Sequence, residues 1–473
     1  MTGIWVALVA AAAFWPGVSS DSLSTTQVSN VQARLADAAQ ERCVDLEFLS
    51  IITSWELGTR QQTLLETSAT VYSVFSDQSL PPPSTVPDNM TDALAPVFSM
   101  ARQIVSNRTT SNHNHTGAQP LMSDGSAADP ASNGVAVLIA GWTGQGDSDG
   151  LNYTGAAKDQ LDFLLNNVSR SSDGAISHRV SQTQLWSDFV YMVPPFLAYY
   201  GVLTENETLV SEAYNQIRVY RNNLRDTNAN NLWQHVVLGS SGTDPGHWST
   251  GNGWAAAGML RVYATIQKSQ YESTFSSEMD DLISWALEIQ KAMYEAVDNT
   301  YIFRNYVDND STFYDGSSTA LMAYTVYRLY TITGDTTYIR QAERSRTALY
   351  AGGATSTFSL SLSSTSTSTA PASTSTSGYE HFTSDGWLTP VVNPHSYGVE
   401  GSESAEAQAF VLLMQSAYEE WVADGSQGSG ALQLLDFGTS ANLGQKTGYA
   451  CRCRGRLQTK ILNINVRDVR AEP

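Results

Sequence analysis

The stretch that decides the fold is DGSSTALMAYTVYRLYTITGDTTYIRQAERSRTALY, residues 315–350. Apolar residues recur in it at three- and four-residue spacings, which is typical of helices that bury one side. Asp315 and Thr336 are residue types that begin helices, and Gly334 is a type that ends one. We therefore expect two antiparallel helices, over 315–333 and 336–350, joined by a short polar turn.

The same helical pattern recurs along most of the chain. It predicts further helices over 24–42, 59–76, 91–106, 133–142, 153–167, 188–201, 207–225, 252–268, 276–297 and 403–422. Short polar turns join many of them in pairs, and we find no convincing run of alternating strand residues. The sequence therefore predicts an all-α fold of about six antiparallel helix pairs.

Changes of composition mark the limits of this helical domain, which we expect to span 21–435 as a single unit. Residues 354–378 are a low-complexity tract rich in Ser and Thr, and they indicate a disordered surface loop inserted into the domain. Residues 1–20 hold a short apolar run followed by small residues, the pattern of a signal peptide. Residues 436–473 are predicted to be an unstructured basic tail.

Secretion is the predicted localisation, because glycosylation sequons follow the leader. Their asparagines are Asn89, Asn107, Asn114, Asn152, Asn167, Asn206 and Asn309. We therefore expect an extracellular glycoprotein that is not membrane-bound after the signal peptide is removed. Cys43, Cys451 and Cys453 are too few for a disulfide framework, and no His or further Cys accompanies the last two as a metal site. No metal and no cofactor is predicted.

The charge of the chain limits the partners it can bind. Its 473 residues carry a net charge of −20, with 26 Lys and Arg against 46 Asp and Glu. Nucleic acids and anionic membranes attract basic patches, so neither is expected as a partner. We expect a monomer.

Four stretches concentrate Trp, His and Gly. They are DGAISHR (173–179), LWSDFVYM (185–192), NLWQH (231–235) and HWSTGNGW (247–254). Sugars bind through aromatic faces and directed hydrogen bonds, so these stretches suit a carbohydrate cleft. Asp188 is the one charged residue of QLWSDFVYMVPPFLAYYGVL (184–203). Because a carboxylate is costly to bury, Asp188 either faces water or is held in an apolar cleft for chemistry.

Together with DGSSTALMAYTVYRLY (315–330) and SAEAQAFVLLMQSAYEEW (404–421), these motifs resemble glycoside hydrolase families 88 and 105, over roughly 130–425. These families are unsaturated uronyl hydrolases, among them unsaturated rhamnogalacturonyl hydrolases of pectin breakdown. The resemblance implies an (α/α)6 barrel with its active site at one mouth. It also implies hydration of the C4=C5 bond of a terminal unsaturated uronic acid, with Asp188 as both general acid and general base. By motif position, the substrate-binding residues would be His178, Arg179, Trp186, His235, Trp248, Thr250 and Trp254.

Two features depart from the family pattern. Thr250 stands where the glycine-rich motif usually carries an Arg, so the identity of the substrate is in question. A second acidic residue is expected in the hairpin before Asp188, but SNGVAVLIAGW (132–142) offers only Asn133. The strong negative charge would repel a polyanionic polymer, which favours a short oligosaccharide over intact pectin.

Two alternatives stay open. One is another (α/α)6 glycosidase that cleaves a saturated uronide or a neutral sugar, which would need a second carboxylate across the cleft from Asp188. The other is a catalytically silent barrel that binds carbohydrate. Asp315 and Asp226 could be catalytic, but their positions fit helix caps or turns better, and Asp244 before Pro245 fits a loop.

Overall fold

A computed structural model describes residues 54–111, 116–351, 380–383 and 386–429. The predicted signal peptide, the 24–42 helix, the Ser/Thr-rich insertion, the basic tail and all three cysteines lie outside these residues. None of the helices in the described part combines the length and the apolar character that crossing a bilayer requires.

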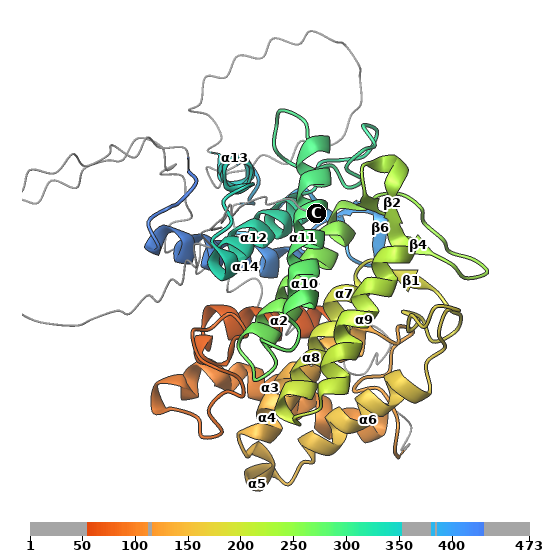
Figure 1. Cartoon of the computed structure of the whole chain (residues 1–473), viewed down its shortest axis with the longest axis vertical. Helices are drawn as coiled ribbons and strands as arrows, with labels where there is room; N and C mark the ends of the chain where they lie inside the picture. The colour runs from red at the N-terminus through yellow and green to blue at the C-terminus, as the bar shows by residue number, and fades with distance from the viewer. Residues whose placement is uncertain (1–53, 112–115, 352–379, 384–385, 430–473) are drawn as a thin grey trace, which may run out of the picture. The chain divides into compact units, whose positions relative to one another are not determined.

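An inner ring of six helices forms the core of the described chain. These helices are α2 (Ser54–Thr67), α4 (Gly134–Trp142), α8 (Pro194–Leu203), α10 (Ser249–Gln267), α12 (Gly316–Thr333) and α14 (Ala405–Ala423). Each contacts the next in that order, and α14 contacts α2, so the ring is closed. Figure 1 shows the closure as the blue α14 beside the red-orange α2. Nearly every residue of α10 and α12 is buried, as expected for helices that are surrounded by others.

A second layer of helices packs outside this ring. It comprises α3 (Thr91–Ser111), α6 (Tyr153–Asn166), α9 (Glu207–Leu224), α11 (Ser276–Ala296) and α13 (Ile339–Leu349). These helices bury one face only; in α9 that face includes Leu209, Ala213, Ile217 and Leu224. Each outer helix follows or precedes its inner partner along the chain and contacts it. The predicted all-α arrangement of paired helices is therefore confirmed.

Some predicted boundaries were wrong for local reasons. The 188–201 helix is two helices, α7 (Phe189–Met192) and α8, because Pro194 and Pro195 supply no backbone N–H to continue the first one. The helix expected from Thr336 begins at Ile339, with Tyr338 as its N-cap. The short helix α5 (Gln145–Asp149) was not predicted.

Three antiparallel strand pairs were also missed. They are β1 (Leu185–Trp186) with β4 (Val236–Val237), β2 (Arg225–Asp226) with β3 (Leu232–Trp233), and β5 (Val391–Asn393) with β6 (Ser396–Gly401). Most are only two or three residues long, too short for alternation to be visible in a sequence.

Two glycines allow α10 to begin close to its neighbours. A Cβ on Gly251 would lie 2.2 Å from Ser187 Oγ, and one on Gly253 would lie 2.8 Å from Leu321 Cδ2. Both distances are too short for a side chain, so only glycine permits this packing. This close packing brings α10 against the segment that carries Asp188.

Candidate active site

The β1–β4 pair joins two of the predicted motifs. Trp186 is opposite Val236 in the register, and the Ser187 N–H donates to the His235 carbonyl at 2.9 Å. These bonds fix Asp188, two residues after Trp186, beside the segment that carries His235. A local β pairing thus assembles side chains from two distant parts of the sequence.

Asp188 occupies the N-cap position of α7, but its carboxyl group does not cap that helix. The side chain lines a cavity instead, and its Oδ1 atom is buried without a hydrogen-bond partner among the described residues. An N-cap Asp usually satisfies backbone N–H groups. An acidic group left without such a partner at a cavity wall is available to a ligand.

Asp129 is the second acidic group of the cavity. It begins a 3-10 helix (Asp129–Asn133) just before α4, and its oxygen, an oxygen of Asp188 and a ring nitrogen of His178 lie within 4.8 Å of one another. Burial raises the pKa of Asp129 well above its usual value, and the carboxyl groups of Asp124 and Asp188 raise it further. Burial therefore favours the protonated form of Asp129, beside the Asp188 carboxyl group.

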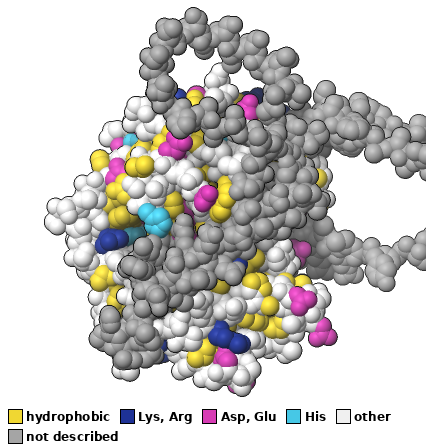
Figure 2. Space-filling view, turned by 180° about the vertical axis from the view of Figure 1, so that it is seen from behind, with side chains coloured by type: hydrophobic (Ala, Val, Ile, Leu, Met, Phe, Trp, Pro, Cys, Tyr) yellow, Lys and Arg dark blue, Asp and Glu magenta, His cyan; other side chains and the backbone are white. Residues whose placement is uncertain are grey.

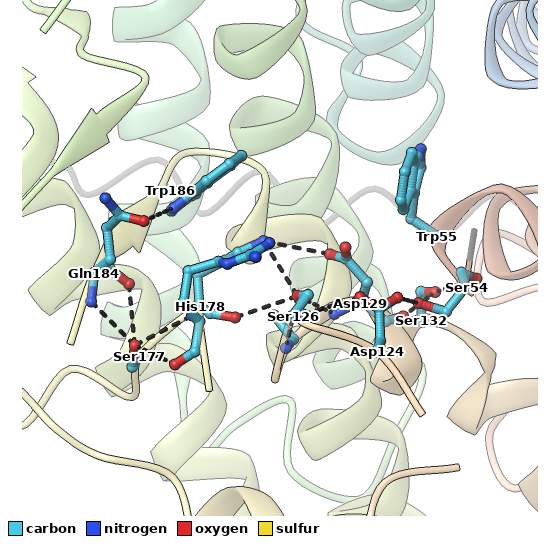
Figure 3. A network of polar contacts seen from close by, with 12 residues as sticks. Ser54, Trp55, Asp124, Ser126, Asp129, Ser132, Ser177, His178, Gln184 and Trp186 are labelled. Carbon is cyan, nitrogen blue, oxygen red and sulfur yellow. Dashed lines mark hydrogen bonds and ion pairs between the residues drawn. The ribbon is translucent and has the colours of Figure 1, made fainter. Parts of the chain in front are cut away.

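His178 and Trp186 form one wall of the cavity. Their rings stack with centroids 4.9 Å apart, and Trp186 Nε1 donates to Gln184 Oε1 at 2.8 Å. Figure 3 shows His178 between Trp186 and Asp129, with its Nε2 3.5 Å from Asp129 Oδ1. Burial lowers the pKa of His178 to about 4, so its imidazole is neutral over most of the pH range.

Asp244 orients His235 from behind. His235 Nδ1 lies 2.9 Å from Asp244 Oδ2, and the Tyr306 hydroxyl donates to the same oxygen at 2.5 Å. Burial alone would raise the pKa of Asp244, but the hydrogen bonds from His235 and Tyr306 outweigh it and lower the pKa. The ionised carboxylate therefore keeps the proton of His235 on Nδ1 and leaves Nε2, which has no partner among the described residues, to a ligand.

Replacing Asp244 with Asn is expected to lower kcat/KM by about 10- to 100-fold, because the charge-assisted bond that orients His235 is lost. A ring ¹⁵N spectrum should show a changed tautomer population for His235, which a general loss of stability would not produce. Asp308→Asn is the matched control, since Asp308 holds His247 Nδ1 at 2.6 Å outside the cavity. Equal effects of the two substitutions would contradict a positioning role for Asp244.

The cavity has a volume of about 220 Å³ and brings together residues from both ends of the described chain. Its lining comprises Trp55, Asp129, His178, Arg179, Trp186, Asp188, Met192, His235, Trp248, Trp254, Pro394, His395, Tyr397 and Glu406. Typical small-molecule pockets hold ~300–1,000 Å³, so this one suits a single sugar ring rather than a length of polymer. Aromatic faces surround the acidic groups, an arrangement that suits the apolar faces and hydroxyl edges of a sugar.

All predicted site residues except one line this cavity. Thr250 has a different place: its hydroxyl donates to Asp315 Oδ2 at 3.0 Å, and both residues are buried outside the cavity lining. Asp315 caps α12 by accepting from Ser317 and Ser318 N–H groups, so the prediction of a helix cap is confirmed. The structure therefore gives Thr250 a packing role between α10 and α12.

The other acidic alternatives are also accounted for. Asp226 caps a short 3-10 helix (Thr227–Ala229) by accepting from the Asn228 N–H, as predicted. Asn133 is not the second acid's substitute in the cavity, because its amide donates to the Ser54 carbonyl at 2.9 Å. Asp129 fills that role, four positions earlier, where an Asp-Pro pair begins the turn before an apolar helix. That pair was the signal that could have revealed it.

Three further residues of the cavity were not predicted as site residues, although Glu406 lies within the 404–421 motif. Tyr397, from the β5–β6 hairpin, meets the His235 ring at 4.4 Å and the Trp186 ring at 6.0 Å, both edge-on. Trp55 and Glu406 meet through a hydrogen bond of 3.0 Å although they lie at opposite ends of the described chain.

The same cluster offers oxygen and nitrogen atoms that a cation could bind. Among the described residues, Asp129, His178 and Asp188 form the group whose atoms could jointly coordinate an ion. Burial favours the protonated form of Asp129, and a cation would have to displace that proton to bind. The arrangement is better suited to proton transfer, with two carboxyl groups of different environment beside a neutral imidazole.

An (α/α)6 barrel with an acidic pair among aromatic rings at a sugar-sized cavity defines a carbohydrate-active enzyme. The family model of Glycosyl Hydrolase Family 88 matches residues 103–387, more than half of the chain. The chain therefore belongs to glycosyl hydrolase family 88, and it is a glycoside hydrolase of the unsaturated uronyl hydrolase type. The resemblance found in the sequence is confirmed.

Solved structures support the same fold. A possible member of the GH105 family from Klebsiella pneumoniae has a TM-score of 0.58 at 14% identity, covering 85% of this chain and 94% of that chain. A possible GH105 member from Salmonella enterica has a TM-score of 0.57 at 14% identity, with coverages of 83% and 93%. An unsaturated glucuronyl hydrolase specific for heparin has a TM-score of 0.52 at 14% identity, with coverages of 84% and 97%. The comparison with curated proteins finds no match.

Proposed function

We propose that this protein hydrates the C4=C5 bond of a terminal unsaturated uronic acid on a short, pectin-derived oligosaccharide, with Asp188 as general acid and general base. The observation that carries the proposal is the Asp188 carboxyl group, which reaches the cavity with an unpartnered oxygen beside Asp129, whose pKa is raised by burial. The heparin-specific unsaturated glucuronyl hydrolase with the same fold supports the reaction class.

The steps follow from this pair of acids. Asp188 gives a proton to C4 of the bound sugar, and the resulting carboxylate takes a proton from the water that adds at C5. The hemiketal formed at C5 opens, and C1 releases the rest of the oligosaccharide. The proton taken from water returns Asp188 to its starting form, so the cycle needs no further proton donor, and Asp129, with an oxygen within 4.8 Å of one of Asp188, influences the exchange through its proximity.

Arg179 is the proposed partner of the uronate carboxylate. Its guanidinium lies 5.7 Å from the centre of the Trp186 ring and lines the cavity. A planar guanidinium can bind a carboxylate through two hydrogen bonds, which would orient the sugar ring against the indole. The size of the cavity limits this binding to the terminal residue, so the enzyme would act from the end of a chain.

The surface charge favours a short substrate. On the face shown in Figure 2, the basic side chains of the described residues are few and scattered among acidic and neutral ones. With a net charge of −20, the protein would repel a long polyanion. A small unsaturated oligosaccharide carries little charge and is repelled less.

The test is to incubate the protein with a panel of unsaturated di- and trisaccharides and their saturated counterparts. Hydration removes the conjugated double bond, so the ultraviolet absorbance of the correct substrate should fall and the saturated sugars should be unchanged. No loss of absorbance with any unsaturated uronide would reject the proposal. Saturable binding without turnover would instead indicate a silent carbohydrate-binding barrel.

The same pair of acidic residues favours a second candidate function, the cleavage of a saturated uronide. Oxygens of Asp129 and Asp188 within 4.8 Å lie closer than the ~6.5–9.5 Å of inverting glycosidases and near the ~5–5.5 Å of retaining ones. Retaining cleavage of a saturated uronide would use Asp129 as the acid and Asp188 as the nucleophile. Release of sugar from a saturated uronide in the panel above would favour this second function.

Secretion as a glycoprotein remains part of the proposal. The sequon asparagines that the structure describes are all exposed, as glycan attachment requires. Protein secreted from eukaryotic cells should lose mass on treatment with an N-glycan-releasing amidase, and replacing Asn309 with Gln should remove one step of that loss. An unchanged mass after treatment would contradict the prediction.

A further inference from the structure

Glu406 is a third carboxyl group in the cavity, and the steps proposed above give it no task. It lies in the first turn of α14 and is only 2% exposed. Its Oε2 accepts from Trp55 Nε1 at 3.0 Å, whereas its Oε1 is buried with no hydrogen-bond partner in the described part of the chain. A buried polar atom that borders a cavity and lacks a partner is a strong sign of a ligand contact.

We propose that Glu406 is a substrate-binding residue whose free carboxyl oxygen hydrogen-bonds a hydroxyl group of the bound uronic acid, on the side of the cavity away from Arg179. This inference rests on the proposed function. Arg179 lies against Trp186, whereas Glu406 holds Trp55, and Figure 3 shows these two indoles on opposite sides of Asp129. The carboxylate of a uronic acid is attached at C5, and C2 lies opposite C5 in the ring. A sugar whose carboxylate meets Arg179 therefore turns its C2 hydroxyl toward Glu406.

The protonation state of Glu406 decides whether its free oxygen can donate a hydrogen bond to the sugar hydroxyl. Burial, and after it the carboxyl group of Glu56 of α2, raise the pKa of Glu406 to about 8 against the lowering effect of the Trp55 hydrogen bond. Asp315 at the start of α12 and Asp188 before α7 are the remaining acidic groups that raise it. The basic groups that line the same cavity are Arg179, His178, His235 and, from the β5–β6 hairpin, His395.

Below pH 8 Glu406 is therefore a neutral acid that can donate its proton to a sugar hydroxyl. As the pH rises through 8 it becomes a carboxylate, loses that donor and repels an anionic sugar. Substrate binding should weaken over the same interval, and the effect should fall on KM rather than on kcat, because the contact is made equally in the ground state and the transition state.

The experiment compares Glu406→Gln, Glu406→Ala and the control Glu400→Gln, an exposed change on β6, with the wild type on an unsaturated disaccharide at pH values on both sides of 8. Wild type and control should show KM rising above pH 8. Glu406→Gln, which keeps the shape and a donor but does not titrate, should lose that rise. Glu406→Ala should raise KM by about 5- to 10-fold at every pH, with kcat nearly unchanged. The inference would be overturned if KM of Glu406→Gln rose above pH 8 as much as that of the wild type. It would also be overturned if Glu406→Ala had the same KM as the wild type.

Two measurements without turnover separate this inference from the proposed reaction. An infrared carbonyl band of a protonated acid should titrate near pH 8 in the free wild type and be missing in Glu406→Gln. Calorimetry of the unsaturated disaccharide should show weaker binding to Glu406→Ala. If the disaccharide binds in this way but is never hydrated, the reaction is wrong and the binding role stands. If binding is the same in both proteins, the binding role is wrong, whatever the reaction. If Glu406→Ala fails to fold, the pH dependence of KM in Glu406→Gln still tests the inference.

Discussion

Replacing Asp188 with Asn is expected to lower kcat by about 10²- to 10⁴-fold on an unsaturated uronyl disaccharide, with little change in KM. The amide has nearly the shape of the carboxyl group but can neither give a proton to C4 nor take one from water. Asp188 Oδ1 has no hydrogen-bond partner in the described chain, so the substitution breaks no contact that holds the fold. The rate of absorbance loss at saturating substrate measures the effect directly.

Asp226→Asn is the matched control for this substitution. Asp226 is another acidic residue of the region, but its side chain caps a 3-10 helix and does not line the cavity. Its replacement should leave kcat within a factor of a few of the wild-type value, with at most a modest loss of stability. A kcat for Asp188→Asn equal to that of the control would reject the assignment of Asp188 as the acid and base.

The helical part of the fold could be predicted because each helix carries its own periodicity. Leu209, Ala213 and Ile217 of α9 mark a buried face by spacing alone, and Asp315 and Gly334 mark the ends of α12 by their capping chemistry. The break between α7 and α8 could also have been predicted, because Pro194 and Pro195 lack the backbone N–H groups that would continue α7. The two-residue strands could not, because they depend on partners far away in the sequence.

The candidate site was predictable where a motif holds several of its residues together. Trp186, Asp188, His235 and Trp254 were expected in one cleft, and all four line the same cavity. Of the site residues that were missed, Asp129 had a local signal, whereas Trp55 and Glu406 come from elements that only the closed ring brings near. Glu406 reaches Trp55 because α14 packs against α2, a contact between the two ends of the described chain. No local pattern encodes such a meeting.

The largest expected effect on stability comes from Glu66, at a buried ion cluster that joins four inner helices. Glu66 of α2 pairs with Arg261 of α10 and with Arg328 of α12, and it accepts a hydrogen bond of 3.0 Å from the Tyr324 hydroxyl. Arg328 also pairs with Glu420 of α14. Glu66, Arg261 and Arg328 are each no more than 3% exposed. Two guanidinium groups therefore depend largely on one carboxylate that water cannot replace.

Glu66→Gln should lower the free energy of unfolding by about 3–5 kcal/mol, because it leaves both buried guanidinium groups without their shared counter-charge. For a domain of this size that loss corresponds to a fall in melting temperature of about 5 °C, measured by circular dichroism. Glu295→Gln, which breaks an exposed pair with Lys291, should leave the melting temperature unchanged. The double variant Glu66→Gln with Arg261→Met should be more stable than the sum of the two single losses, since the second change removes a charge that the first left unpaired. Strictly additive losses of unfolding free energy would show that the charged groups act independently. The cluster would then not stabilise the inner ring as a unit.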